Sequence, residues 1–552
     1  MFLLMSASIG LFFGWKDRKS KDSKNYLTGD RSLAIFPVVL SLAASFMSTN
    51  TILGVPAEVY TLGTQFVIHV IPFTIAVCLS AHVFMPVFYE LNMTSVNEYL
   101  QLRFESRAVR LAGSFGFIFC TLPYMGVVLY GPSLALSSVT DLSVNHCILI
   151  VGLICTFYTS IGGIKGVIWT DVLQCFLMMA GLLMIVCYSV VDMGISEPFR
   201  IANRHDRLKL FDFSLNFYRN DVFLAIFIGS MVNWCGNYCI SQTEVQRFCA
   251  TKSPDHARKT LFWNIPPVIF ISLLAIWCGI IVFAKYYLCD PISMGIIKRP
   301  DQLMPYYVMD NMAGIPGAAG LFVACVFSGS LSTLSSGFNS LAAVTYDDLL
   351  QRFLSESFRT KHSRLSGSIT QILAASFGLI SLALAFFVGR LGTVLQASIA
   401  LSGSIRGPLF ALFCLGLFVP FANARGALTG VTLGIACAIT MAMGTILHPR
   451  PKAHLNLYVN NCSSSIYEVY GHRPAAQHIL PWEYEPQGID KFIHLSYFFV
   501  SVIGFLVTIN IGLVVSLLTR SADHSVDPKY LSRFCLPDCL SFRQRSKYDV
   551  NP

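Results

Sequence analysis

The stretch that decides the fold is SLAASFMSTNTILGVPAEVY, residues 41–60. It belongs to an apolar segment long enough to cross a membrane, yet hydroxyl and amide side chains crowd its middle between Ser45 and Thr51, and Pro56 follows. Such side chains compete with the helical hydrogen bonds, and proline removes one backbone donor. Freed carbonyls at membrane depth are tolerated only where they line a cavity or bind something. The stretch therefore predicts a broken membrane helix beside a binding site.

The rest of the chain has the composition of a membrane protein. Of its 552 residues, 54% are hydrophobic and only 12% are charged, whereas about a quarter of a soluble protein is charged. Apolar runs of the length that a membrane helix needs recur along the chain. We predict an all-α polytopic membrane protein with about 13 transmembrane helices. The predicted spans lie near 1–15, 33–60, 66–90, 110–138, 144–164, 168–193, 222–250, 262–286, 314–347, 367–389, 391–418, 425–447 and 493–519.

The ninth predicted span carries a polar face. In SGSLSTLSSGFNS, residues 328–340, the positions Gly329, Ser332, Thr333 and Ser336 follow the spacing i, i+3, i+4, i+7 and share one side of a helix. Hydroxyl oxygens are hard ligands that suit a hard cation. The alternative is a small-residue face for helix packing, which is common in membranes.

A second interruption is predicted in MVNWCGNYCISQTEVQRFCA, residues 231–250, where amides and hydroxyls again break the apolar run. The alternative is an ordinary amphipathic helix end. The two interrupted spans are the second and the seventh, five apart, as an inverted five-plus-five repeat requires. Broken helices in corresponding halves point to a transporter whose ion site lies near the middle of the membrane.

Charged loops predict the topology. The basic segment 16–31 is expected to be cytoplasmic by the positive-inside rule, and alternation places 103–110, 252–259 and 352–364 on the same side. Loop 195–221 disagrees, because it should face outward yet carries five basic residues.

The net charge of +9 is spread over short loops, which favours a topology signal over nucleic-acid binding. The first span lacks a basic n-region and an A-x-A site, which favours a shortened helix over a signal peptide.

The longest polar insertion, 448–492, is predicted to be extracellular. It carries the sequon Asn461-Cys462-Ser463, so we expect Asn461 to be glycosylated, whereas Asn92 is expected to face the cytoplasm and to stay unmodified.

We predict that residues 1–519 form a single transmembrane domain and that 520–552 form a cytoplasmic tail. The 17 cysteines are scattered without a CxxC pair, and we predict that they are small core residues.

Several stretches give the chain a family resemblance over nearly its whole length. They are YLTGDRS (26–32), SLAASFMSTNTILGVP (41–56), PYMGVVLYGPSLAL (123–136), IGGIKGVIWTDVLQ (161–174), EVQRF (244–248), ACVFSGSLST (324–333) and FSGSLSTLSSGFNSL (327–341). On these stretches the chain resembles the sodium/solute symporter family, and within it the branch of sodium-coupled monocarboxylate, sodium-dependent multivitamin and iodide symporters, whose shared substrate theme is a small anion. The resemblance implies a LeuT-type fold with inverted repeats at about 33–193 and 222–418, and a plasma-membrane location.

The resemblance implies a Na⁺ site built from five positions. Backbone carbonyls of Ala44 and Met47 would come from the broken second span, and the carbonyl of Gly329 with the hydroxyls of Ser332 and Thr333 from the ninth. Asp171 matches an acidic residue near the cytoplasmic end of the family's ion path. The alternative for that residue is a charge at a helix end.

The resemblance also implies substrate-binding positions. Thr51 and Tyr124 match pocket-lining residues, and Tyr238 matches an aromatic gate beneath the substrate. Buried core aromatics are the alternative for both tyrosines.

One residue departs from the family pattern. In SGSIRGPLF, residues 402–410, Arg406 stands where relatives carry a small residue before Gly-Pro. A charge at this depth is costly and needs compensation. We hypothesise that Arg406 anchors the carboxylate of the substrate. It could instead form a structural pair with Glu58, Glu244 or backbone carbonyls, or extend to the interface.

The sequence thus predicts a Na⁺-coupled symporter that imports a small organic anion, a monocarboxylate or vitamin-like carboxylate. The alternatives are an iodide-like inorganic anion symporter and a non-transporting Na⁺-gated sensor or leak channel on the same fold. Enzymatic function finds no support, since HExxH and G-x-S-x-G are absent from the sequence. The expected partners are Na⁺, a small anion and the lipid bilayer, with no nucleic acid and no organic cofactor, in a monomer or weak oligomer.

Overall fold

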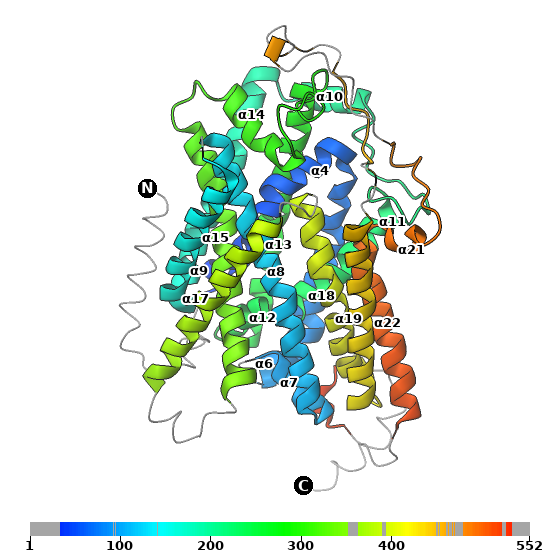
Figure 1. The fold of residues 1–552 in the computed structure, drawn as a ribbon. Helices are drawn as coiled ribbons and strands as arrows, with labels where there is room; N and C mark the ends of the chain where they lie inside the picture. The colour runs from blue at the N-terminus through cyan, green and yellow to red at the C-terminus, as the bar shows by residue number, and fades with distance from the viewer. Residues whose placement is uncertain are drawn as a thin grey trace.

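In a computed structural model, the protein is a bundle of long helices that run between two ends of the molecule (Figure 1). The described residues are 34–91, 93, 95–140, 142–351, 363–388, 393–448, 451, 453–459, 462, 466, 468–469, 479–520 and 526–532. Within them the chain is helical and holds no strand, only an isolated bridge between Ala453 and Ile479. The predicted first span, 1–15, lies outside the described residues.

The helices in chain order have the following bounds. The first half contains α3 (Ile35–Phe46), η3 (Asn50–Gly54), α4 (Val55–Leu62), η4 (Thr64–His69), α5 (Val70–Leu79), η5 (Ser80–Phe84), α6 (Met85–Leu91), α7 (Asn97–Phe104), α8 (Arg107–Val139), α9 (Val144–Met193) and α10 (Glu197–Arg204). The second half contains α11 (Phe223–Tyr238), α12 (Gln242–Cys249), α13 (Pro254–Tyr286), η6 (Pro300–Gln302), α14 (Leu303–Asn311), α15 (Ala318–Val344), η7 (Thr345–Leu350), α17 (Ser363–Val388), α18 (Val394–Phe418), α19 (Ala424–Leu447), α21 (Asp490–Ile493), α22 (Tyr497–Leu518) and η9 (Pro528–Tyr530).

The membrane-spanning character predicted from composition is confirmed. In the described part of the chain, nine helical segments are long and apolar enough to cross a membrane, or up to eleven if each bent helix pair counts as one span. Every predicted span from residue 33 onward coincides with a described helix or helix pair. The predicted spans 144–164 and 168–193 both lie within the 50-residue helix α9, so no break in helical structure separates them. The second of them coincides with the membrane-spanning segment Gly166–Met193.

Both predicted interruptions are present. Helix α3 and the segment 50–62 meet at an angle of 55° across a short break, and α11 and α12 meet at 52°. The two breaks occupy equivalent places in the two halves of the sequence, one in the second and one in the seventh predicted span. This arrangement gives each half one helix with backbone groups available at the middle of the bundle.

Helices differ in how deeply they lie in the bundle. In the apolar stretch of each span, 83% of the residues are buried in α18, and 72% are buried in α13 and in α15. The buried share falls to 39% in α19 and in α22, and to 33% in α17. Large apolar side chains such as Phe157 and Phe387 are more than 60% exposed, as lipid contact requires. Helices α13, α15 and α18, together with the two broken helix pairs, therefore form the centre of the bundle.

The two ends of the bundle differ in their connections. Helices α6 and α7 lie at one end and α10 and α14 at the other (Figure 1). The insertion packs on the α10 and α14 end, where the Leu455 amide donates to the carbonyl of Thr61 at 2.9 Å. A disulfide joins Cys289, after α13, to Cys462 in the insertion. The prediction that all cysteines are small core residues is wrong for this pair, because the partners are 173 residues apart and no spacing motif reveals them.

The basic loop that disagreed with the topology has a structural explanation. Arg207 is buried, donates to the carbonyls of Tyr60 and Asn456, and lies 4.2 Å from the centre of the Phe283 ring. Burial lowers the pKa of Arg207 to about 10. Arg219 forms ion pairs with the carboxylates of two loop aspartates at 2.6 and 2.7 Å. These two arginines stabilise the packing of the loop, so their positive charge does not indicate on which side of the membrane the loop lies.

Candidate functional site

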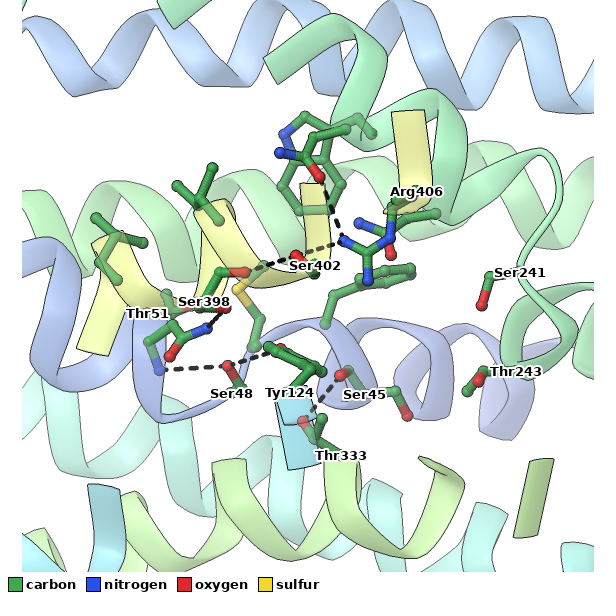
Figure 2. Close-up of a pocket in the computed structure, with 18 of the residues that line it drawn as sticks. Ser45, Ser48, Thr51, Tyr124, Ser241, Thr243, Thr333, Ser398, Ser402 and Arg406 are labelled. Carbon is green, nitrogen blue, oxygen red and sulfur yellow. Dashed lines mark hydrogen bonds between the residues drawn. The ribbon is translucent and has the colours of Figure 1, made fainter. Parts of the chain in front are cut away.

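A cavity of about 170 Å³ lies at the middle of the bundle, between the two broken helix pairs. Helices α8, α13, α15 and α18, the short helix η4 and the first turn of α22 also contribute to its wall. Figure 2 shows that polar side chains from several of these elements surround it. The polar lining residues include Ser45, Ser48, Asn50, Thr51, Tyr124, Asn233, Ser241, Thr243, Glu244, Thr333, Ser336, Ser398, Ser402 and Arg406.

The break after α3 is stabilised by its own polar side chains. The amide of Ser48 donates to the carbonyl of Phe46, and the Ser48 hydroxyl accepts from the amide of Asn50 at 3.2 Å. The Asn50 side chain donates to the hydroxyl of Ser398 on α18 at 2.6 Å. These bonds replace part of the lost helical ladder. They explain why a hydroxyl-rich stretch breaks here and what ties the break to α18.

Three of the five predicted Na⁺ ligands, Thr333, Gly329 and Met47, lie close together at this break. The Thr333 hydroxyl donates to the carbonyl of Ser45 at 2.9 Å and lies 3.0 Å from the carbonyl of Gly329. A Cβ atom on Gly329 would stand 3.0 Å from the carbonyl oxygen of Met47, so the absence of a side chain lets α15 approach the break closely. Ala44 is fully buried. Thr333, Gly329 and Met47 thus converge, and the carbonyl that contacts Thr333 is that of Ser45.

Asp171 on α9 is the centre of a buried polar cluster. Its carboxylate accepts from the hydroxyl of Ser41 at 2.6 Å and from the hydroxyl of Ser332 at 2.7 Å. The Arg247 guanidinium on α12 forms an ion pair with it at 3.1 Å and also donates to the Ser336 hydroxyl. Ser332 therefore faces Asp171, whereas Thr333 faces the break. A hydroxyl contact between Ser45 and Ser336 at 3.2 Å links the two groups.

Arg406 on α18 lines the cavity with neutral partners. Its Nη1 donates to Asn233 Oδ1 and to the Ser402 hydroxyl, each at 3.3 Å (Figure 2). On the facing wall, a Cβ atom on Gly236 would lie only 2.4 Å from Arg406 Cγ, so a residue without a side chain makes room for the arginine stem.

The carboxylates considered as structural partners of Arg406 make other contacts. Glu58 accepts from Tyr497 at 2.8 Å, and the ion-pair partner of Glu244 is Arg247, at 3.5 Å. Arg406 also borders a second cavity of about 30 Å³, which Asn97 and Gln242 help to line. The guanidinium therefore stands between the central cavity and a smaller one toward the α7 end.

The other predicted substrate residues divide into two groups. Thr51 and Tyr124 line the cavity, and the Tyr124 hydroxyl contacts that of Ser48 at 3.4 Å. Tyr238 is fully buried, stacks on Phe46 with ring centres 4.4 Å apart and donates to Asn264 at 2.5 Å. Phe46, not Tyr238, lines the cavity.

Some residues of the site escaped the sequence-based reasoning. Arg247 lies in a stretch used for the family resemblance, but no role was assigned to it, because its pairing with Asp171 depends on how α12 packs against α9. Asn233 was counted only among the polar residues of the second interruption, and Ser402 was not singled out, although an arginine in a membrane segment signals that polar neighbours must exist. Asn461 and Asn92, the predicted glycan acceptor and the predicted non-acceptor, lie outside the described residues.

Two broken helices facing a hydroxyl-rich helix across a polar cavity define a class of protein, the secondary transporters with inverted repeats. The chain belongs to the sodium:solute symporter family. Residues 26–434 match the sequence profile of the Sodium:solute symporter family, and the protein is a multi-pass membrane protein and a Na⁺-coupled solute symporter, as predicted.

Named relatives agree with this assignment. Sodium-coupled monocarboxylate transporter 1 from Homo sapiens is 38% identical over 539 residues, which cover 96% of this chain and 88% of the relative. The sodium/iodide cotransporter from Homo sapiens is 36% identical over 540 residues, which cover 95% and 83%. Among solved structures, a Na⁺-coupled sialic acid symporter in a substrate-bound outward-open state has a TM-score of 0.75 at 24% identity, covering 95% of this chain and 97% of that one. The fold class predicted from the sequence is thereby confirmed.

Proposed function

We propose that this symporter imports a small monocarboxylate anion together with Na⁺ across the plasma membrane by alternating access, as a monomer or weak oligomer. The observation that carries the proposal is the Arg406 guanidinium, which lines the central cavity with two neutral hydrogen-bond partners at 3.3 Å. A guanidinium stays charged at any relevant pH and presents a planar fork that fits a carboxylate with two parallel hydrogen bonds.

The anchor role follows from charge compensation. Arg406 is half-buried at the middle of the bundle, and a charge there that meets only amide and hydroxyl groups is poorly compensated. An incoming carboxylate would supply the missing negative charge at Arg406. A cavity of about 170 Å³ suits a ligand of a few heavy atoms, because a site of about 150 Å³ holds a molecule of the size of benzene. Thr51 and Tyr124 would contact the rest of the anion.

The proposed Na⁺ site uses the converging oxygens at the break after α3. Thr333 and Gly329 supply a hydroxyl and a carbonyl, and Met47 a carbonyl from the facing element. Ala44 and Ser332 stay predicted ligands. For Ser332 to bind the ion, its hydroxyl must rotate away from Asp171. Neutral oxygens suit Na⁺ because they bind a hard cation without adding buried charge. Asp171, with Arg247 beside it, would border the path by which the ion leaves.

The proposed orientation places the insertion 448–492 outside the cell and the tail 520–552 inside. A disulfide is typical of an oxidising compartment, and the Cys289–Cys462 bond lies at the α10 and α14 end. Of the predicted cytoplasmic segments, 103–110 and 252–259 lie at the other end, next to α6 and α7, where Tyr89 donates to the carbonyl of Thr251. Tyr238 stays a predicted gate residue, and it would act through Phe46, on which it stacks.

The relatives support a carboxylate as the substrate. The two named human relatives carry, by their names, a monocarboxylate and iodide. A guanidinium fork discriminates between these anions, because iodide cannot accept two parallel hydrogen bonds at separate oxygens. We therefore place a monocarboxylate ahead of an iodide-like anion for this chain.

Radiolabelled uptake tests the proposal. Cells that express the protein are given lactate, butyrate, pantothenate, biotin or iodide with Na⁺ or choline outside. We expect Na⁺-dependent uptake of a monocarboxylate. Arg406→Gly should abolish it at normal surface expression, and Arg406→Lys should keep the charge but lose affinity. Arg425→Gly, an exposed arginine at the start of α19, serves as the matched control and should transport normally. Normal uptake of every anion by well-expressed Arg406→Gly would refute the anchor role.

A further inference from the structure

His69 is a buried histidine at the central cavity for which the proposed transport cycle gives no role. It is the last residue of the short helix η4, is 6% exposed and lines the cavity. The Phe66 ring stacks on it with ring centres 4.4 Å apart, and the Trp234 ring on α11 lies nearly parallel to it at 6.5 Å. Two aromatic rings thus restrict the orientation of the imidazole.

The hydrogen bond at one ring nitrogen decides the role of the other. Nδ1 of His69 lies 2.6 Å from the carbonyl oxygen of Phe66. Because a carbonyl oxygen only accepts, Nδ1 carries the proton of the ring and donates it to this bond. Nε2 makes no hydrogen bond in the described part of the chain. It is therefore the ring nitrogen that remains available to a ligand in the cavity.

The surroundings of His69 favour a neutral ring. Among the described residues no carboxylate forms an ion pair with it. An imidazolium would add a second positive charge to a cavity that Arg406 already lines, and burial against aromatic rings penalises such a charge. In the neutral ring Nε2 has a lone pair and no proton, so it accepts a hydrogen bond and donates none.

This acceptor lies close to the proposed carboxylate anchor. Arg406 donates to Asn233, and the next residue of α11, Trp234, packs on His69. The anchor and the acceptor therefore both contact the same turn of α11. A carboxylate oxygen does not suit Nε2, because both atoms present lone pairs. What Nε2 needs is a hydrogen-bond donor on the rest of an anion that is held at Arg406.

We propose that His69 is a specificity-determining residue whose Nε2 accepts a hydrogen bond from a hydroxyl group of the transported anion. The site then favours a hydroxymonocarboxylate over the unsubstituted acid, which leaves Nε2 without a partner. It also favours the hydroxy acid over the oxo acid, whose carbonyl is itself an acceptor. A site that pairs with a substrate hydroxyl discriminates against analogues that lack it. The inference rests on the proposed import of a monocarboxylate and narrows its substrate class.

Competition against labelled butyrate uptake measures this preference in the unmodified protein. Two series of inhibitors are compared: lactate with pyruvate and propionate, and 3-hydroxybutyrate with acetoacetate and butyrate. In at least one series, the hydroxy acid should inhibit at a concentration roughly 3- to 10-fold lower than the other two acids, the gain that one neutral hydrogen bond supplies. Equal inhibition within both series, or an oxo acid that binds best in both, would overturn the inference.

Removing the acceptor tests whether His69 is the cause of the preference. His69→Phe keeps an aromatic ring between its neighbours but has no ring nitrogen, so the advantage of the hydroxy acid should disappear. His82→Phe is the matched control, because His82 is an exposed histidine of the same span that lies beside Phe262 and outside the cavity lining. It should keep the preference. An unchanged preference in well-expressed His69→Phe would overturn the inference.

The two series also separate this inference from the proposed function. If no labelled monocarboxylate enters the cells, the proposed function fails. If monocarboxylates enter and the hydroxy acids have no advantage, only the role of His69 fails. If His69→Phe does not reach the cell surface, the comparison of hydroxy, oxo and unsubstituted acids still decides, because it is made on the unmodified protein.

Discussion

Removing the Thr333 hydroxyl while keeping the side-chain shape perturbs the proposed Na⁺ site most selectively. In the structure this hydroxyl donates to the carbonyl of Ser45 at 2.9 Å and lies 3.0 Å from that of Gly329. Thr333→Val leaves a buried acceptor unsatisfied, which costs about 1–3 kcal/mol. If the same oxygen is a Na⁺ ligand, a loss of this size in binding free energy corresponds to roughly a 5- to 150-fold weaker apparent affinity.

The assay is the Na⁺ dependence of substrate uptake. We expect the Na⁺ concentration for half-maximal uptake to rise within that range in Thr333→Val, while surface expression changes little. Ser328→Ala is the matched control, because its buried hydroxyl bonds to the carbonyl of Ala324 within α15 and does not line the cavity. An unchanged Na⁺ dependence in well-expressed Thr333→Val would show that this hydroxyl is not a ligand.

Three further predictions concern stability and topology. Burial raises the pKa of Asp301 to about 6, so the fold favours the protonated acid, and its stability rises as the pH falls from about 6 toward 4. Ionisation above pH 6 costs about 3 kcal/mol. Asp301→Asn should flatten this rise in thermal midpoint between pH 6.5 and 4.5, and an equally steep rise in the variant would contradict the assignment. Replacing Cys289 and Cys462 by serine removes the disulfide and should cost roughly 2–4 kcal/mol, seen as a lower thermal midpoint; an unchanged midpoint would mean that the bond adds nothing. Glycosidase shifts should disappear with Asn461→Gln and persist with Asn92→Gln, and the reverse pattern would invert the proposed topology.

The breaks in the membrane helices could be predicted from the sequence because their cause is local. Side chains such as Ser48 and Asn50 compete with the backbone hydrogen bonds of their own segment, and the structure shows those bonds formed at the break. The polar face of α15 is equally local, since helical spacing alone places Gly329 and Thr333 on one side. Composition and periodicity are sufficient to predict a structural feature when the interactions that cause it lie within a few residues of one another in the sequence.

The partners across the bundle could not be predicted in this way. The ion pair between Asp171 and Arg247 joins residues 76 positions apart, and the disulfide joins residues 173 apart. Arg406 was recognised as a charge in need of compensation, but its contact with Asn233 depends on the approach of α11 to α18, which Gly236 permits. Such pairs are decided by packing, and no short sequence pattern encodes them.

The central claim, Na⁺-coupled import of a monocarboxylate, is tested most directly with the purified protein in proteoliposomes. Labelled lactate or butyrate is added outside, with an inward Na⁺ gradient or with choline replacing Na⁺. The account predicts that label accumulates above the outside concentration only with the Na⁺ gradient, and that Arg406→Gly vesicles accumulate none. Equal entry of label with Na⁺ and choline, or no entry in either, would contradict it.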